Sequence, residues 1–179
     1  VQWTAGGVAL CTATGAQEWP TIVADGAGGA IVTWQDYRSG SNYDIYAQRI
    51  SAEGTVQWTA NGVALCTTTG AQKWPTIAAD GAGGAIVTWW DYRSGSNYDI
   101  YAQCISADGT ILWAADGVAL CTASNNQYYL WEIVSDDVGG VIATWLDARS
   151  GDADVYAQRI SASGAVQWEA DGVALCSAA

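Results

Sequence analysis

Histidine, methionine and phenylalanine are absent from this 179-residue sequence, and proline occurs only twice. Without histidine, acid–base chemistry near neutral pH would fall to carboxylates, a perturbed thiol or tyrosine. A zinc site of the cysteine–histidine kind is excluded for the same reason, and the five cysteines are far apart in the sequence. Because even an initiator methionine is missing, we expect a processed or excised piece of a longer polypeptide.

Basic residues are scarce, since six of them face eighteen acidic residues and leave a formal net charge of −12. A charge of this sign repels phosphate backbones and anionic lipid head groups, so nucleic acid is a poor partner. No apolar run reaches the roughly 18 residues of a membrane span, and no charged-then-apolar leader is visible, so we expect no membrane insertion. Eleven tryptophans and nine tyrosines instead predict a folded chain with a buried core.

The sequence contains a repeat with a period of fifty-five residues, marked by the tryptophans of Val-Gln-Trp or Ile-Leu-Trp at positions 3, 58, 113 and 168. We divide the chain into repeat 1 (1–55), repeat 2 (56–110), repeat 3 (111–165) and a partial repeat (166–179) that holds only the first strand segment. The third copy drifts further, with one extra residue around 123–131. The first two copies differ at seven pairs of positions: Gly6/Asn61, Ala13/Thr68, Glu18/Lys73, Val23/Ala78, Gln35/Trp90, Arg49/Cys104 and Glu53/Asp108.

Each copy holds four extended segments rich in isoleucine, valine, threonine, tyrosine and tryptophan, and no segment shows a helical period. The glycine-rich stretch 25–29 predicts a tight hairpin, because glycine adopts positive φ without steric cost. In the first copy the segments are Val1–Trp3 continued through Val8–Cys11, then Pro20–Ala24, Ala30–Asp36 and Asp44–Ser51.

Both faces of the predicted strands are apolar. Ile31 and Thr33 point one way, while Val32 and Trp34 point the other. A small sheet with two apolar faces must be packed between neighbours. We therefore predict an all-β fold of tandem four-stranded antiparallel blades of about 55 residues, of β-propeller type. A β-trefoil is the alternative, because it too consists of three repeats of four strands, although the extra segment 166–179 has no place in it.

The repeat carries four recurring phrases: Trp-Pro-Thr-Ile, Asp-Gly-Ala-Gly-Gly-Ala-Ile-Val-Thr-Trp, Asp-Tyr-Arg-Ser-Gly and Asp-Ile-Tyr-Ala-Gln-Arg-Ile-Ser. Together they resemble the blades of secreted bacterial β-propellers related to the sialidase and Asp-box type, which occur in large surface proteins of unknown function. Residues 51–58 lack one spacer residue of the Asp-box, so the chain is a relative of that group and not a member. The resemblance implies a fold and not an activity.

Three blades are fewer than the roughly four to eight of closed propellers. Either two chains combine or the array is part of a longer one. The segment 166–179 is surplus in this count, and we expect it to pair with the open edge of another chain.

Paired carboxylates flank one loop in each copy. Such pairs suit a glycosidase, and calcium is a weaker alternative for them, with no other cofactor expected. Catalysis needs one asymmetric constellation, however, and these groups recur three times, so we favour a structural Asp–Arg pair that pins each loop. The carboxylates are Asp36 with Asp44, Asp91 with Asp99, and Asp147 with Asp154.

The same loops supply the candidate ligand-binding residues, in which tyrosine rings and guanidinium groups would stack against a sugar or a protein surface. They are Tyr37, Arg38, Tyr43, Tyr92, Arg93, Tyr98 and Arg149. Repetition would make such a site multivalent. No catalytic and no metal-binding residues are assigned.

The cysteines divide into two kinds. Cys11, Cys66, Cys121 and Cys176 share one repeat position, and we expect buried free thiols there. Cys104 stands where the other copies have arginine, and we expect an odd, exposed thiol able to couple chains.

These observations predict a non-catalytic repeat scaffold for adhesion or recognition, extracellular or on the cell surface. Its partners would be copies of itself, further repeats of a longer chain, a carbohydrate or a cell-surface protein. The first alternative is a structural subunit that assembles head to tail into a filament. The second alternative is a glycoside-processing enzyme.

Overall fold

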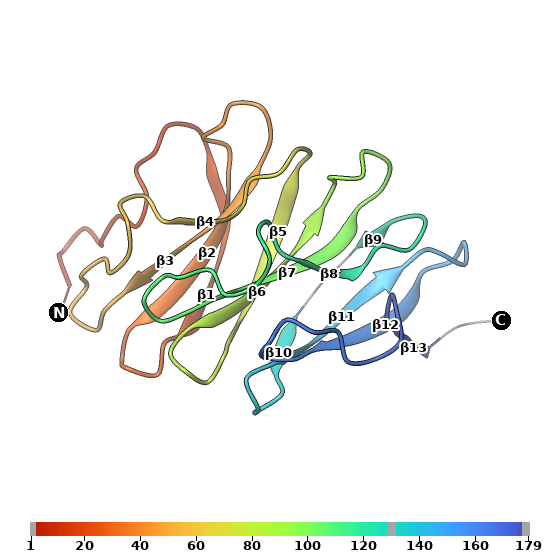
Figure 1. The fold of residues 1–179 in the computed structure, drawn as a ribbon. Helices are drawn as coiled ribbons and strands as arrows, with labels where there is room; N and C mark the ends of the chain where they lie inside the picture. The colour runs from red at the N-terminus through yellow and green to blue at the C-terminus, as the bar shows by residue number, and fades with distance from the viewer. Residues whose placement is uncertain (1–2, 129–131, 177–179) are drawn as a thin grey trace.

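The computed structural model describes residues 3–128 and 132–176, and this part of the chain contains strands, turns and loops but no helix. The strands form three antiparallel sheets that lie side by side along the chain (Figure 1). We call them blades 1, 2 and 3. Blade 1 has the order β1 (Gln17–Ala24), β2 (Ala30–Asp36), β3 (Asp44–Ile50) and β4 (Val63–Cys66). Blade 2 has the order β5 (Gln72–Ala79), β6 (Ala85–Asp91), β7 (Asp99–Ile105) and β8 (Val118–Cys121).

Blade 3 repeats this plan with one irregularity. Its main path is β10 (Ile133–Ser135), β11 (Val141–Asp147), β12 (Asp154–Ile160) and β13 (Val173–Cys176), and β9 (Gln127–Tyr128) also pairs with β11. β9 and β10 together occupy the place of β1 and β5. The extra residue of the third copy therefore falls between β9 and β10, which both pair with β11.

The sheets run out of phase with the sequence repeat as we divided it. β4, β8 and β13 each come from the start of one repeat but pair with the third strand of the preceding one. The expectation that 166–179 is surplus is therefore wrong: its described part contains β13, the fourth strand of blade 3. The corresponding segment Val8–Cys11 forms no strand. Val1, Gln2 and residues 177–179 lie outside the described residues.

The prediction that both sheet faces are buried is confirmed. In β2, Ile31 is fully buried and Trp34 is 4% exposed, although their side chains point to opposite faces. Apolar clusters fill the junctions between successive blades; Ile31 and Leu65 of the first junction pack with Trp89 from blade 2. The fold is thus all-β, with tandem four-stranded antiparallel blades of β-propeller type. A β-trefoil does not describe three separate sheets.

The first strand of each blade lies next to the first strand of its neighbour, as β1 does to β5 and β5 to β10. These strands are sheet edges, and we call them the inner strands. Pro20 and Pro75 are found in them because an edge strand leaves one row of N–H groups unpaired, so that a residue without an N–H is tolerated. The hairpin at 25–29 forms as predicted, with Asp25 Oδ1 accepting hydrogen bonds from the N–H groups of Ala27 and Gly29.

Candidate functional site

A cluster of charged and aromatic side chains lies where the inner strands of blades 1 and 2 begin. The Tyr43 hydroxyl donates a hydrogen bond of 3.0 Å to Oε2 of Glu18, and the Gln35 amide donates one of 3.2 Å to the same oxygen. Gln35 also links the two blades, because its Oε1 accepts a 3.1 Å bond from the backbone N–H of Trp74. The bond to Glu18 is the main cause that raises the pKa of Tyr43, so this hydroxyl remains a donor at neutral pH.

Blade 2 contributes the cationic half of the cluster. The Nζ of Lys73 lies 5.5 Å from the ring centroids of both Tyr43 and Trp74, within cation–π range. The Trp74 ring meets Trp90 edge-on at 4.5 Å and Tyr98 at 6.1 Å. The lysine is therefore placed over an aromatic surface that spans the junction of the two blades.

The backbone beside these side chains adopts an unusual conformation. Trp19 and Trp74 have φ values of 53° and 49°, a left-handed region that costs a bulky residue roughly 1–3 kcal/mol. Each lies in a β-bulge, where the register shifts between Glu18 and Thr21 and at the same point of blade 2. A bulge re-aims the side chains around it. Here it leaves Trp19 61% exposed, directly after the exposed Glu18. We call Glu18, Trp19, Tyr43, Lys73 and Trp74 the rim site.

The rim site is where two nearly identical repeats become chemically different. Glu18 pairs with Gln35 across β1 and β2, and Lys73 pairs with Trp90 at the same register across β5 and β6. These two positions account for two of the seven differences between repeats 1 and 2. The paired aspartates that the sequence offers for catalysis recur in all three copies. At this place the groups do not recur, and a carboxylate faces an ammonium group across an aromatic surface.

The predicted tyrosines lie on this side of the blades. The rings of Tyr37 and Tyr43 are 5.0 Å apart and tilted, as are those of Tyr92 and Tyr98. Tyr43 belongs to the rim site, and Tyr98 packs against Trp74 behind it. Sequence reasoning missed four members of the rim site: Glu18, Trp19, Lys73 and Trp74. The signal that could have found them was the pair of opposed substitutions at 18/73 and 35/90.

The predicted arginines are used inside their own blades. Arg38 contacts Asp36 at 2.6 Å, donates to the backbone carbonyl of Asn61 at 2.8 Å, and stacks its guanidinium 3.7 Å from the Tyr46 ring centroid. Arg93 and Arg149 repeat the ion pair with Asp91 and Asp147, each at 2.6 Å. Each of the three arginine side chains is only 20–22% exposed. This is the structural Asp–Arg pair that the sequence favoured.

The second carboxylate of each pair differs strongly from the first. Asp44 lies opposite Asp36 in the β2–β3 register, and Asp99 lies opposite Asp91. Burial is the main cause that raises the pKa of Asp44 and of Asp99 to about 6, and the neighbouring carboxylate adds to it. For Asp36, burial opposes the shift, but hydrogen bonds from Arg38 and Trp34 hold the pKa below its ordinary value. These aspartates are at most 4% exposed, so a polymeric substrate does not reach them.

Calcium was the weaker alternative for these carboxylates. Asp36 Oδ2 accepts hydrogen bonds from Trp34 Nε1 at 2.7 Å and from Arg38 Nη2 at 2.6 Å, so its charge is already compensated by protein donors. No group of three or more cysteine, aspartate or glutamate side chains within residues 3–128 and 132–176 is arranged to hold a metal ion.

The cysteines are free thiols. Cys66 and Cys121 are buried as predicted, whereas Cys11 is half-buried and Cys176 is exposed. The expectation of an exposed Cys104 is wrong: it is 3% exposed, in the apolar junction of blades 2 and 3. The reason is that the arginines at this position in the other blades pair with Asp25 or Asp136, whereas the short thiol lies within the core.

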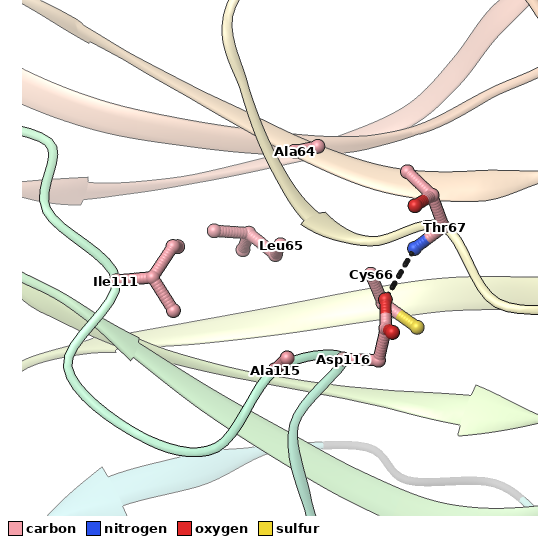
Figure 2. Close-up of a pocket in the computed structure, with 7 residues that line it drawn as sticks. All are labelled: Ala64, Leu65, Cys66, Thr67, Ile111, Ala115 and Asp116. Atoms are coloured by element: carbon pink, nitrogen blue, oxygen red, sulfur yellow. Dashed lines mark hydrogen bonds between the residues drawn. The ribbon is translucent and has the colours of Figure 1, made fainter.

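A hollow of about 260 Å³ lies between β4 and the loop at 111–116 (Figure 2), and none of its lining residues belongs to the rim site. Its walls are mostly apolar and include Leu65, Cys66 and Ile111. Its one carboxylate belongs to Asp116, whose Oδ1 accepts a 3.0 Å hydrogen bond from the Thr67 N–H (Figure 2). This carboxylate therefore joins the loop at 111–116 to Thr67, which directly follows β4, and is not directed at a ligand.

The described residues include no helix long and apolar enough to span a membrane. No family model and no curated protein matches the sequence. Solved structures do match. An α-L-arabinofuranosidase from Lactobacillus brevis aligns with a TM-score of 0.54 at 11% identity, over 89% of this chain and 58% of that one. An endo-arabinase from Bacteroides thetaiotaomicron VPI-5482 aligns with a TM-score of 0.49 at 16% identity, over 91% and 64%. This chain thus spans less than two thirds of each.

The likeness confirms the β-propeller type of fold, while the narrower resemblance to the sialidase and Asp-box group stays a prediction. The comparison overturns the prediction of a non-catalytic adhesion scaffold, and with it the expectation that the chain has no enzymatic role. The α-L-arabinofuranosidase is named for action on a glycoside, and this agrees better with the glycoside-processing alternative than with the scaffold.

Proposed function

We propose that this chain is part of a glycoside-processing enzyme of β-propeller type, and that the rim site binds its sugar substrate. The observation that carries the proposal is the exposed Trp19 beside Glu18, at the register position where repeats 1 and 2 carry side chains of opposite charge. An exposed indole offers an apolar face to a sugar ring, and the neighbouring carboxylate and ammonium offer partners for hydroxyl groups.

Glycoside hydrolysis commonly uses two carboxylates, one on each side of the scissile bond. On the described parts of the inner strands, and directly before β10, the exposed carboxylates are Glu18 and Glu132. We assign Glu18 the role of general base, which takes a proton from the water that attacks the anomeric carbon, with Tyr43 and Gln35 orienting its carboxylate. Glu132, on blade 3, is the proposed general acid, which gives its proton to the glycosidic oxygen as the bond to the leaving sugar breaks. Lys73 between them would bind a substrate hydroxyl or ring oxygen.

The substrate class follows from the fold comparison and from the charge. An acidic protein repels polyanionic substrates, so a neutral polysaccharide is favoured. The names of the matching structures point to arabinose-containing glycans, which we propose as the substrate. A polysaccharide of this kind would be met outside the cell, and an extracellular location is part of the same proposal.

The test is hydrolysis of linear arabinan and of an aryl α-L-arabinofuranoside by the purified protein, followed by reducing-sugar release. Glu18→Gln is expected to lower kcat/KM by about 100-fold or more, the usual loss when a positioned acid or base is removed. Glu53→Gln, which changes an exposed carboxylate in the 51–55 turn, is the matched control and should leave turnover unchanged. Absence of turnover on both substrates, or full activity of Glu18→Gln, would refute the proposal.

A further inference from the structure

One arginine side chain ties blade 1 to blade 2. Arg49 donates from Nε to Oδ2 of Asp25 in its own blade at 2.9 Å, and its Nη2 lies 2.8 Å from the same oxygen. Its Nη1 donates a 2.8 Å bond to the backbone carbonyl of Ala107 in blade 2. The same carbonyl accepts a 3.1 Å bond from Nε1 of Trp58. A single guanidinium group therefore spans a carboxylate of one blade and a carbonyl of the next.

The junction of blades 2 and 3 has the two acceptors of this contact but not the arginine. Asp80 is the counterpart of the first acceptor, and its Oδ1 accepts two 2.8 Å bonds from backbone N–H groups of its hairpin, as in blade 1. The second acceptor is the carbonyl of Ala162, which Trp113 Nε1 holds at 3.0 Å. Cys104 stands at the arginine position, and among the described residues no donor pairs with Oδ2 of Asp80.

The two acceptors are arranged as they are where the arginine is present. A methyl group placed on Gly84 would lie 2.6 Å from Oδ2 of Asp80, against 2.8 Å and 2.7 Å at the same position of the two blades that have the arginine. The carboxylate therefore keeps its orientation. The spacing of the blades is also kept, because a methyl group on Gly83 would lie 3.7 Å from the Asp25 carbonyl oxygen. One on Gly139 would lie 3.6 Å from that of Asp80. Blade 3 has not closed over the missing side chain.

Solvent reaches the acceptors of this second junction more easily than those of the first. Asp25 is 5% exposed and Trp58 is 9% exposed, whereas their counterparts Asp80 and Trp113 are half-buried. The apolar cluster of the second junction also contains smaller side chains at three equivalent positions. They are Cys104 for Arg49, Ala78 for Val23 and Ala143 for Val87. With the blade spacing unchanged, the second junction has room and access for a guanidinium group that the chain itself does not supply.

We propose that the junction of blades 2 and 3 binds the guanidinium group of a ligand, which Asp80 Oδ2 and the Ala162 carbonyl accept in place of the missing arginine. The ligand class is inferred from a template within the molecule, because the equivalent acceptors hold a guanidinium group at the junction of blades 1 and 2. The rest of the ligand extends into solvent, since the stem of the arginine begins inside the junction, where the buried Cys104 lies. The inference concerns binding and does not rest on the proposed enzymatic function.

The arrangement of the acceptors favours a guanidinium group over other cations. A planar guanidinium presents its N–H groups as a fixed fork, so that one edge meets a carboxylate oxygen while another N–H reaches a second acceptor. An ammonium group is a compact, strongly hydrated point charge without this fork. A calcium ion takes six to eight oxygen ligands, and within residues 3–128 and 132–176 no group of three or more acidic or thiol side chains is arranged to hold a metal.

Thermal unfolding in the chloride salts of N-methylguanidinium and of methylammonium tests the site, with sodium chloride added to keep the ionic strength equal. Concentrations up to about 50 mM are far below those at which guanidinium salts denature proteins. N-Methylguanidinium at about five times its dissociation constant should raise the Tm by about 2–4 °C, and methylammonium should not. No rise with N-methylguanidinium, or an equal rise with the two cations, overturns the proposal.

Substitutions at the site show where the cation binds. Asp80→Asn keeps the Oδ1 acceptor that the hairpin uses but removes the charge, so the rise in Tm should be lost. Cys104→Arg supplies the missing side chain, and it should melt at a higher temperature than the wild type and no longer respond to the cation. Glu53→Gln, at an exposed carboxylate outside this junction, is the matched control and should respond as the wild type does. An undiminished response of Asp80→Asn contradicts the site even if Cys104→Arg fails to fold.

A peptide identifies the source of the guanidinium group. Calorimetric titration with Gly-Arg-Gly is compared with the same peptide carrying uncharged citrulline in place of arginine, which should not bind. Binding of Gly-Arg-Gly at least about tenfold tighter than N-methylguanidinium assigns an arginine of a polypeptide as the ligand, whereas binding no tighter assigns a small guanidinium compound. Equal binding of the arginine and citrulline peptides refutes recognition of a guanidinium group.

Discussion

Tyr43 donates its hydroxyl hydrogen to Oε2 of Glu18 over 3.0 Å, and so ties the loop between β2 and β3 to the inner strand of the same blade. We expect Tyr43→Phe to lower kcat/KM on arabinan by about tenfold, because one hydrogen bond to a charged group is lost and the carboxylate is less well oriented. Steady-state kinetics measure this. The loss should appear in kcat more than in KM. A change in KM alone would assign Tyr43 to binding and not to positioning.

Exchanging the rim of blade 1 for that of blade 2 separates function from folding. The double variant Glu18→Lys with Gln35→Trp recreates the pair that Lys73 and Trp90 already form in the same fold. We expect the fold to be kept, with the free energy of unfolding lowered by about 1–3 kcal/mol because the Trp74 N–H loses its acceptor on Gln35, and complete loss of turnover. Urea unfolding and the arabinan assay give the two values. Retained turnover would show that the asymmetry has no catalytic meaning.

The exposed Trp19 should carry sugar affinity. Trp19→Ala removes an indole that is 61% exposed, and we expect oligosaccharide binding to weaken by about fivefold to tenfold, on the order of 1 kcal/mol. Isothermal titration with arabino-oligosaccharides measures the loss. Leu112→Ala, at an exposed apolar residue outside the rim site, is the control. Substitution should also relieve the positive φ at this position only in part, so a large gain in stability is not expected.

Stability should be greatest near pH 4. The folded pKa of Asp44 and of Asp99 is about 6, above the ordinary 3.8, so the stability that they contribute is full below about pH 3.8 and is lost as pH rises from there through 6. Asp36 and Asp147 have a pKa below the ordinary value, so their contribution is present at neutral pH and is lost as pH falls below about 4.

The melting temperature as a function of pH checks this profile. Asp44→Asn with Asp99→Asn should flatten the decline between pH 4 and pH 6, by about 1 kcal/mol for each residue once solvent screening is allowed for. A profile that rises steadily from pH 5 to pH 8 would contradict the burial of these two carboxylates.

Thiol reactivity should separate the cysteines into fast and slow groups. Burial is the main cause that raises the pKa of Cys66, Cys104 and Cys121 to about 12, so their thiolate fraction at pH 8 is very small. We expect Cys176 to react first with a disulfide reagent, and the three buried thiols to react only on unfolding. Mass spectrometry of partly labelled protein identifies the sites. Early labelling of Cys104 would disagree with its burial between blades 2 and 3.

Much of the fold could be predicted because the period of the repeat and the apolar residues on both faces of the strands can be read directly from the sequence. Ile31 and Trp34 point to opposite sides and both are buried, as expected for sheets stacked on one another in a chain whose described residues form no helix. The phase of the blades could not be obtained in this way. The period gives the length of the repeating unit but not the residue at which each blade begins. β4 lies in the second sequence repeat, yet it pairs with β3 and completes the sheet of blade 1.

The candidate site was predicted only in part. Loop tyrosines such as Tyr43 were found because an aromatic ring beside an arginine-containing loop can stack against a sugar or a protein surface. Glu18 and Lys73 were recorded as differences between repeats but were not compared with the positions opposite them. The cross-strand register that brings Glu18 next to Gln35 depends on a bulge, and the sequence does not mark where a strand inserts an extra residue.

Segments 58–66 and 113–121, each of which contacts two successive blades, also set the order in which the described part of the chain opens. Blade 2 is contacted by both segments, whereas blades 1 and 3 are each contacted by one of the two, and arrays of repeats unfold by nearest-neighbour steps. Amide hydrogens of β6 and β7 should therefore be the last to exchange with deuterium, and those of β13 and β1 among the first.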